Sequence, residues 1–521
     1  MGVPLYLEPR LTPRLTSLLR SGRFLHALVG GLGSPLNVVL PDQIADNLTH
    51  FRDVYRTHRL SGQVFFAHKA NRSSALVRRL AATDAGLDAA SLGELQHALG
   101  AGFTPDRIMA TGPKDPEFLW LAARTGVLVH VDGQAELDEL AALVRQYGLP
   151  PAGVLLRLSG FASEGTRLLT RPSRFGTPAG ELGGLLTTLE RYPDELRLAG
   201  VGYHLDTTSL AEKAVALEGC VRAMDECRGR GLNPRIIDIG GGFGVSYLAD
   251  GEQWERYTTE LTRAVMGRRP ALTWRRHGYG LWHEAGTLRG SLALYPAHRP
   301  VAAEKYLDAL LTQPAPALGT RLATLLLEGL CDLYVEPGRA LADQCGLTLA
   351  RVLEVRRTGA GERVVRLAAN ATDVALEEHG VLMDPVVVPA DGRRAPAAGG
   401  PVGVHLAGNL CLEADMITRR TVFLPYPPCP GDLLAFANTA GYCMDFRAGE
   451  AQRQPVARKA AVWQDGRDGA RERRDGRERQ DGQDDGHGEV PWRWCLDEEY
   501  WPVAQQAHHP RHHGTPAGGG A

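Results

Sequence analysis

The sequence lacks any apolar run that approaches the ~20 residues a helix needs to cross a bilayer. Its opening residues, MGVPLYLEPR, contain Pro4, Glu8 and Pro9 and no apolar stretch like that of a secretory signal. These absences argue against a membrane span and against secretion. We therefore predict a cytoplasmic protein with no membrane partner.

A surplus of charge of one sign is also missing, because 58 Lys and Arg residues stand against 60 Asp and Glu residues. Nucleic-acid binding usually carries a basic signature, so its simplest electrostatic argument fails. The eight cysteines form no CxxC pair, and their spacing is irregular for a zinc ribbon. We expect reduced thiols in a cytosolic chain, no nucleic-acid partner and no metal site.

The 521 residues are long enough for two to four domains at ~150 residues each. Residues 464–489 read QDGRDGARERRDGRERQDGQDDGHGE, with Ala470 as the single apolar residue. Such a segment cannot bury a core, so we expect it to be disordered. Because exposed Trp clusters are costly, we expect the aromatic patch that follows to pack onto the main body. The patch consists of Trp492, Trp494, Tyr500 and Trp501.

Short β-rich runs alternate with amphipathic helical patterns over much of the chain. Eight runs occur, at 64–67, 86–90, 107–110, 127–131, 154–158, 200–204, 236–239 and 333–335. This alternation favours parallel βαβ units, and eight of them predict a (β/α)8 TIM barrel. The segment 271–331 is an excursion before the eighth strand. We interpret it as a lid or substrate loop, or alternatively as a surface decoration.

Beyond residue 338 the pattern changes to strands with few helical windows. The strand-like runs lie at 347–355, 363–367, 386–389, 402–406 and 433–436. They predict a mainly-β domain appended to the barrel. We assign the barrel to 46–340, the β domain to 1–45 and 341–463, and a low-complexity, mostly disordered tail to 464–521.

Side chains with useful chemistry follow several of the predicted strands, at the edge where a barrel places its active site. In chain order these residues are Lys69, Asp88, Arg157, His204, Thr207, Gly241, Gly242, Glu336, Gly338 and Arg339.

The glycines at 240–242 do not complete a dinucleotide fingerprint, because Val245 follows where its third glycine would be needed. They still allow backbone N–H groups to approach an anion closely. With Gly338 and Arg339 on the adjacent strand they predict a phosphate cradle, and the alternative is a tight βα turn. A lysine that forms a Schiff base, a phosphate cradle and a carboxylate together meet the requirements of pyridoxal phosphate. The carboxylate would keep the pyridine nitrogen protonated, so that the ring accepts electrons.

The order and spacing of these motifs resemble the fold-type III pyridoxal-phosphate decarboxylases, the group of diaminopimelate and ornithine decarboxylases, over residues 40–446. HKAN resembles the family's lysine motif and implies that Lys69 carries the cofactor. GYHLDTT resembles the strand with the ring-stacking histidine, here His204, and puts Thr207 at the usual phosphate contact. DIGGGFG and EPGR match closely, and DAASLGEL and SRFG also match.

In the β domain, CLEAD resembles the family's Cys-x-x-x-Asp and AGY resembles the motif whose tyrosine reaches the phosphate. The resemblance implies that Cys411 protonates Cα and that Tyr442 contacts the phosphate. Glu413 and Asp415 are the candidate substrate contacts. In the family this cysteine comes from the neighbouring subunit, which implies a head-to-tail homodimer with two shared sites.

Three departures from the family pattern indicate a divergent branch. Asp206 stands where the family has glycine, beside the phosphate. Leu412 replaces the acidic residue that reads a distal amino group. The Arg-Pro-x-x-Tyr run of diaminopimelate decarboxylases is missing, and residues 370–373 read NATD instead. The amino-acid substrate is therefore not identified.

The favoured hypothesis is α-decarboxylation of an amino acid with pyridoxal 5'-phosphate as cofactor. A racemase or epimerase on the same barrel is one alternative, but alanine racemases usually place arginine where Glu336 stands. A non-catalytic, decarboxylase-like binding protein is the other, although such relatives typically lose the lysine or the cysteine, and both are present here.

Overall fold

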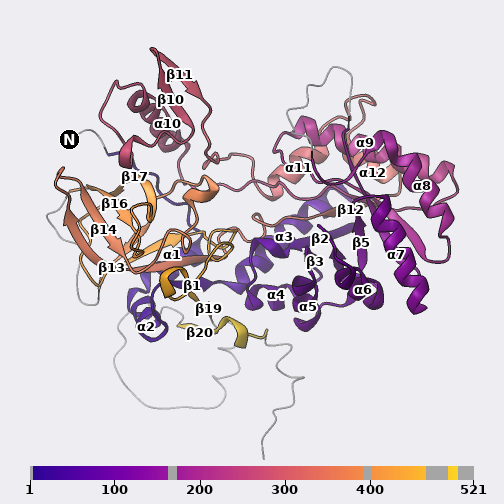
Figure 1. Cartoon of the computed structure of the whole chain (residues 1–521), viewed down its shortest axis with the longest axis horizontal. Coiled ribbons are helices and arrows are strands. Elements are labelled where there is room, and N and C mark those ends of the chain that lie inside the picture. The colour runs from indigo at the N-terminus through magenta and orange to yellow at the C-terminus, as the bar shows by residue number, and fades with distance from the viewer. Residues whose placement is uncertain (1–3, 162–172, 391–399, 465–490, 503–521) are drawn as a thin grey trace, which may run out of the picture.

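The computed structural model describes residues 4–161, 173–390, 400–464 and 491–502. Two halves lie side by side (Figure 1): a barrel ringed by helices and a domain built around a β-sheet. The tail segments 465–490 and 503–521 lie outside the described residues.

Eight parallel strands close the barrel, because each pairs with the next along the chain and the last returns to the first. They coincide with the eight predicted runs and confirm the (β/α)8 barrel. The short β7 (Thr177–Pro178) pairs with the end of β6, the fifth strand of the barrel. The strands are β2 (Gly62–Ala67), β3 (Gly86–Ala89), β4 (Ile108–Ala110), β5 (Leu128–Val131), β6 (Ala152–Ser159), β8 (Leu196–Gly202), β9 (Ile236–Asp238) and β12 (Asp332–Val335).

Helices surround the barrel, and the sequence marks their ends. Asp115 caps α6 by accepting the N–H of Phe118 at 2.8 Å, and Gly126 ends it in the left-handed region at φ 78°. The helices are α3 (Pro41–His58), α4 (Ser74–Ala81), α5 (Leu92–Gly100), α6 (Pro116–Thr125), α7 (Gln134–Tyr147), α8 (Leu182–Arg191) and α9 (Leu210–Gly229).

The excursion before β12 serves both halves. A hairpin of β10 (Leu281–Glu284) and β11 (Thr287–Gly290) projects beside the β domain, after α10 (Gly251–Val265) (Figure 1). Thr273 bridges to Arg420 of the β domain. The later helices, α11 (Glu304–Thr312) and α12 (Leu322–Glu328), return to the barrel.

The second half is a mainly-β domain, as expected. Its sheet runs β17-β16-β14-β13-β1-β19-β20, with β18 on β13 and β15 on β18. The helices α1 (Pro13–Arg20) and α2 (Gly22–Leu32) contribute to its apolar core. The strands are β1 (Leu36–Val39), β13 (Gly346–Arg357), β14 (Arg363–Leu367), β15 (Val386–Val388), β16 (Val402–Ala407), β17 (Met416–Leu424), β18 (Leu433–Ala437), β19 (Arg458–Gln464) and β20 (Trp492–Leu496).

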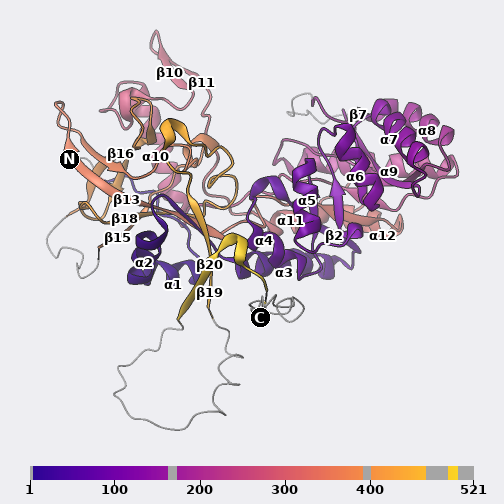
Figure 2. The same ribbon diagram turned by 60° about the horizontal axis from the view of Figure 1, so that its bottom comes forward.

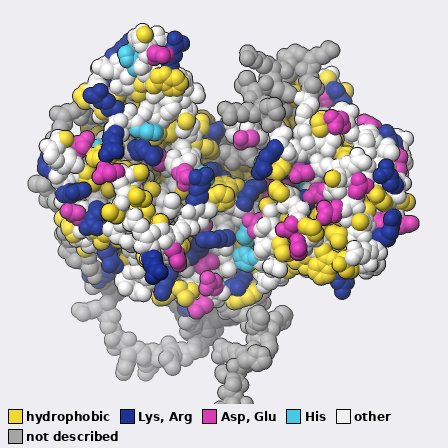
Figure 3. All heavy atoms as spheres, viewed as in Figure 1, with side chains coloured by type: hydrophobic (Ala, Val, Ile, Leu, Met, Phe, Trp, Pro, Cys, Tyr) yellow, Lys and Arg dark blue, Asp and Glu magenta, His cyan; other side chains and the backbone are white. Residues whose placement is uncertain are grey.

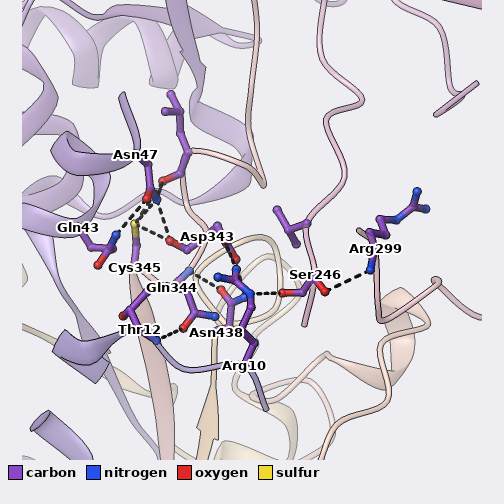
Figure 4. Close-up of polar contacts among 12 residues, drawn as sticks. Arg10, Thr12, Gln43, Asn47, Ser246, Arg299, Asp343, Gln344, Cys345 and Asn438 are labelled. Carbon is purple, nitrogen blue, oxygen red and sulfur yellow. Dashed lines mark hydrogen bonds and ion pairs between the residues drawn. The ribbon is translucent and has the colours of Figure 1, made fainter. Parts of the chain in front are cut away.

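Polar side chains connect the two halves (Figure 4). Asn47 of α3 donates to the carbonyl oxygens of Leu341 and Asp343, both at 2.8 Å. Asp343 also pairs with Arg10 from the N-terminal segment and accepts from Asn438 at 2.7 Å. The chain therefore crosses from β12 into the β domain through a fixed junction.

The amino-terminal part of the barrel interior is apolar. Phe65, Met109 and Leu155, from alternate strands, form a buried layer of the kind that fills TIM barrels. Polar residues are consequently free to gather at the carboxyl end. On the face in Figure 3, cationic and anionic side chains are interspersed over both halves. No helix in the described ranges is long and apolar enough to cross a membrane.

Candidate active site

A cavity of about 790 Å³ opens at the carboxyl ends of the barrel strands. Its walls combine ionisable side chains with aromatic and small residues. The ionisable ones are Lys69, His130, Arg157, Arg174, His204, Asp206, Glu212 and Glu336.

Lys69 lies in the 3₁₀ turn η1 (His68–Ala70) at the end of β2 and is half-buried. Burial alone would lower the pKa of its ammonium group, but the charges of Asp88 and Glu336 outweigh burial and raise it above its ordinary value. Tyr442 donates its backbone N–H to the carbonyl of Ala70 at 2.8 Å. The loop that carries Lys69 is therefore in contact with the β domain of its own chain.

Glu336, directly after β12, lies at the end of the strand that pairs with β2, the strand before Lys69, and it is buried. Its Oε2 lies 3.2 Å from Nδ1 of His204, which follows β8. Burial alone would raise the pKa of Glu336, but the hydrogen bond and the charges of His204, His130 and Lys69 lower it overall. Glu336 is thus a carboxylate at neutral pH.

Two further carboxyl groups, Asp88 of β3 and Asp238 of β9, are buried near Glu336. Burial, and then the charge of Glu336, raise the pKa of both. One carboxylate oxygen of each, and Nε2 of buried His130, have no hydrogen-bond partner among the described residues. His130, Asp238 and Glu336 bring their ligand atoms within 4.8 Å of one another. Sequence reasoning missed His130 and Asp238 as site residues, although both lie at the ends of predicted strands.

The glycine cradle has the crowding expected where backbone must approach a ligand. A β-carbon at Gly241 would lie 2.8 Å from the carbonyl oxygen of Glu336, and Gly242 has φ 85°. A β-carbon at Gly338 would lie 2.7 Å from the hydroxyl of Tyr442. The glycines, the Tyr442 hydroxyl, the unpaired buried polar atoms and the adjacent lysine together fit a phosphorylated pyridine aldehyde.

Lys213 of α9, a residue the sequence reasoning did not select, lies behind the cradle and is fully buried. It donates to the carbonyl of Gly241, and its Nζ lies 5.0 Å and 5.4 Å from the ring centroids of Phe243 and Tyr306. No carboxylate forms an ion pair with it in the part of the chain described here. Burial lowers the pKa of Lys213 to about 7. A buried lysine one turn into a helix gives no sequence signal that separates it from a solvated one.

Of the remaining barrel residues of the predicted site, Arg157 lines the cavity, whereas Thr207 and Arg339 follow β8 and β12 without lining it. Arg157 of β6 is 3.5 Å from Asp132 and stacks 4.9 Å from the ring of Phe175. Thr207, after β8, accepts the N–H of Ser209 at 3.0 Å. Arg339 donates to the hydroxyl of Tyr247 and lies 5.2 Å from the ring of Tyr442.

The three candidates from the CLEAD loop do not reach the cavity of their own chain. Cys411 is exposed, and its N–H donates to Gln452 Oε1 at 2.9 Å. Glu413 is exposed and pairs with Arg275 of the excursion at 2.8 Å. Asp415 is buried, and its carboxylate accepts the N–H groups of Ala371 and Leu410, both at 2.8 Å, which shapes the loop. Of the four candidates from the β domain, Tyr442 is the one that contacts the Lys69 loop of its own chain, through the hydrogen bond from its N–H to Ala70.

Comparisons with known proteins agree with this geometry. The sequence profile described as "Pyridoxal-dependent decarboxylase, pyridoxal binding domain" matches residues 42–287. An uncharacterized protein of Sinorhizobium fredii is 32% identical over 479 residues, which is 89% of this chain and 94% of that protein. The diaminopimelate decarboxylase of Methanothermobacter thermautotrophicus is 31% identical over 264 residues, 44% of this chain and 56% of that enzyme.

Among solved structures, the diaminopimelate decarboxylase of M. jannaschii in complex with L-lysine superposes with a TM-score of 0.63. It shares 18% sequence identity over 84% of this chain and 88% of that one, so it supports the fold. The cofactor of the family is pyridoxal phosphate, which the cradle and Lys69 fit. The chain is a divergent member of the pyridoxal-dependent decarboxylases of fold type III, the group that contains the diaminopimelate and ornithine decarboxylases.

Proposed function

We propose that this protein removes the α-carboxylate of an amino acid as CO2, with pyridoxal phosphate bound at Lys69. The observation that carries the proposal is the buried Glu336 at the end of β12, next to Lys69 at the end of the neighbouring strand β2, with a pKa that its surroundings lower. When bound, the cofactor supplies an electron sink for a carbanion at Cα. The relatives' activities support the same reaction class.

Glu336 is suited to hold a proton on an aromatic ring nitrogen, because its own pKa is lowered and it does not compete for that proton. His204 fixes one carboxylate oxygen at 3.2 Å. An arginine at this position would instead repel a proton from the ring nitrogen. The carboxylate therefore favours decarboxylation over racemisation.

Lys69 must lose a proton before its amine can attack a carbonyl carbon, and its raised pKa opposes that loss. Asp88 exerts the strongest charge on Lys69, and the pKa of Asp88 is itself raised by burial. Asp88 is paired across the sheet with Ala67, two residues before Lys69, and a carboxylate with a raised pKa is a stronger base than an ordinary one. We assign Asp88 the role of accepting the Lys69 proton.

We further propose a homodimer in which the partner's CLEAD loop covers the open end of the barrel. Support comes from the exposed position of Cys411 and from the lining of its own chain's cavity, which does not include it. Cys411 would then deliver a proton to Cα at the neighbouring site, as the resemblance implies. All eight cysteines are free, which agrees with a cytoplasmic location.

The distal end of the substrate is not held by the family's two known clamps, because Leu412 and residues 370–373 lack the required charges. The decisive experiment is a screen of amino acids for CO2 release by the purified, cofactor-loaded protein. We expect release from at least one amino acid and none from Lys69→Ala, which should also lose the visible absorbance of lysine-bound cofactor. Loss of optical rotation without CO2 would contradict the proposal and indicate a racemase.

A complementation experiment tests the shared site. Lys69→Ala and Cys411→Ala homodimers are mixed, so that each heterodimer has one site with both changes and one with neither. Random pairing should restore about a quarter of wild-type activity per site. Cys411→Ala alone should slow the reaction by ~10²–10⁴-fold and leave cofactor affinity unchanged. Heterodimers without recovered activity would show that both residues serve the same subunit's site.

A further inference from the structure

The chain returns to the barrel after residue 490. β20 pairs antiparallel with β19 at the edge of the β domain, with Trp492 opposite Gln464. It is followed by the 3₁₀ turn η7 (Asp497–Glu499), which lies beside α4 (Figure 2). Tyr500 and Trp501 come next, and both contact Arg78 of α4. We call residues 491–502 the C-terminal clasp.

Asp497 is the central contact of the clasp and is buried, with 7% of its surface exposed. Its Oδ2 accepts the N–H of Ser74 at 2.8 Å, and its Oδ1 accepts the N–H of Ala75 at 3.2 Å and the hydroxyl of Ser73. Ser73 is the N-cap of α4, and the other two residues form its first turn. A carboxylate more than 400 positions away in the chain thus supplies the acceptors that the first N–H groups of this helix lack.

Aromatic and cationic contacts hold the clasp in place around Asp497. Arg78 of α4 donates to the carbonyl oxygens of Glu498 and Tyr500 at 2.6 Å and 2.9 Å. Its guanidinium lies 4.1 Å from the ring centroid of Trp501. Tyr500 is buried and packs edge-on against Trp463 of β19. The clasp therefore does more than extend the sheet, because it also binds the barrel helix α4 through hydrogen bonds and a cation–π contact.

The first turn of α4 is only a few residues beyond Lys69, and a chain of side chains joins them. Ser74 Oγ lies 3.1 Å from Nε2 of His97, whose Nδ1 lies 2.7 Å from Nε2 of His68. His68 immediately precedes Lys69, and its Nδ1 lies 3.3 Å from Oε1 of Glu94. The backbone on both sides of Lys69 is therefore linked to the residues that Asp497 holds.

We propose that the C-terminal clasp positions the Lys69 loop for the cofactor, with Asp497 as the positioning residue. The proposal rests on the proposed role of Lys69 in cofactor attachment. Without the clasp, the start of α4 and its contacts with His97 become ordered only when the cofactor binds, and the free energy of this ordering is subtracted from the binding free energy. The fraction of molecules with a competent loop then falls, and cofactor affinity falls in proportion.

The test compares Asp497→Ala with two matched controls. Glu499→Ala removes an exposed carboxylate from the same turn. Asp250→Ala removes the N-cap of α10, a helix far along the chain from Lys69. Oδ1 of Asp250 accepts the N–H of Glu252 at 2.8 Å. The Asp250 variant therefore reports what loss of a helix cap does to stability alone.

The measurements are the dissociation constant of pyridoxal phosphate, amide hydrogen exchange at residues 74 and 75, and the melting temperature. Asp497→Ala should weaken cofactor binding by about five- to tenfold, the factor that corresponds to losing a helix cap, and should speed exchange at both amides. Asp250→Ala should lower the melting temperature comparably while cofactor affinity stays within twofold. Glu499→Ala should change none of the three, and Asp497→Glu should recover part of the affinity.

Two results would overturn the proposal. One is an Asp497→Ala protein with faster exchange but wild-type cofactor affinity, which would make the clasp purely structural. The other is equal loss of affinity in Asp250→Ala, which would assign the effect to general stability. If Lys69→Ala keeps the visible absorbance of lysine-bound cofactor, the proposed function fails instead. That failure is distinguishable, because it is read from absorbance of the Lys69 variant and not from amide hydrogen exchange of the Asp497 variant.

Discussion

Replacement of Lys213 by methionine should change how stability depends on pH. Lys213 is fully buried behind the glycine cradle, and burial lowers its pKa from an ordinary value of 10.5 to about 7. The unfolded chain therefore binds more protons than the folded chain between pH 7 and 10.5. Stability from this residue rises with pH across that window, and the penalty is largest below pH 7.

The magnitude follows from the shift. At 1.36 kcal/mol per unit, the penalty in the wild-type protein is about 5 kcal/mol at pH 6 and falls to about 1 kcal/mol at pH 10. Lys213→Met removes this dependence but loses the hydrogen bond to the carbonyl of Gly241, a loss of about 1.5–3 kcal/mol. The variant should be the more stable protein by about 2–3.5 kcal/mol at pH 6 and the less stable one at pH 10.

The assay is urea unfolding of the cofactor-free proteins at several pH values, followed by tryptophan fluorescence. Lys114→Met is the matched control, because the side chain of Lys114 is also fully buried but pairs with Glu136 at 3.0 Å and donates to the carbonyl of His130 at 2.7 Å. Removing it leaves a carboxylate without its partner and should destabilise by about 3–5 kcal/mol. Parallel pH profiles for wild-type protein and Lys213→Met would refute the reasoning.

Three further outcomes are expected. Deleting residues 467–488 should leave fold and activity nearly intact. It should also raise the free energy of unfolding by about 1–2 kcal/mol, because Gln464 and Trp492 are paired and a five-residue connection between them costs less loop-closure entropy than the present one. A lower melting temperature would contradict this. Gly338→Ala should weaken cofactor binding, since its β-carbon would lie 2.7 Å from the Tyr442 hydroxyl, and Tyr442→Phe in the same chain should partly restore affinity in a titration. Asp384→Ala should cost about 3–5 kcal/mol in thermal or urea unfolding because it leaves fully buried Arg420 without its ion-pair partner, whereas an unchanged midpoint would show that water replaces the carboxylate.

The barrel was predictable because its strands are short apolar runs with helical patterns between them. Each run overlaps an observed strand with bounds that agree within two residues, except that β8 begins four residues before the predicted run 200–204. The edge of the β domain was harder. Met416–Leu424 contains two arginines within a mostly buried strand, and Trp492–Leu496 follows a charged segment, so neither shows a clear apolar run. The expectation that the aromatic patch packs onto the main body is confirmed for Tyr500, which is buried, and is wrong for Trp494, which is exposed.

The candidate site also contains residues that the sequence pattern reveals and residues that it does not. Residues that follow strands in sequence, such as Lys69 and Glu336, were found because barrel topology brings strand ends together. Lys213 and Asp497 were not found, because their roles depend on which backbone groups a helix or a distant turn meets in three dimensions. Cys411 and Glu413 remain predictions that depend on a second subunit.

Asp206 adds a negative charge beside the predicted phosphate site, and the position of Lys213 shows how that charge can be compensated. Asp206 is exposed, so water screens its charge, and at 4 Å such a charge contributes about 1 kcal/mol. Lys213 is fully buried behind Gly241, where the effective dielectric constant is lower and the same separation corresponds to about 4 kcal/mol. A phosphate dianion at the cradle would favour the protonated form of Lys213, whose pKa lies near 7 in its absence. The buried cation therefore outweighs the exposed anion, and the Asp206 substitution is compatible with a phosphate at the cradle.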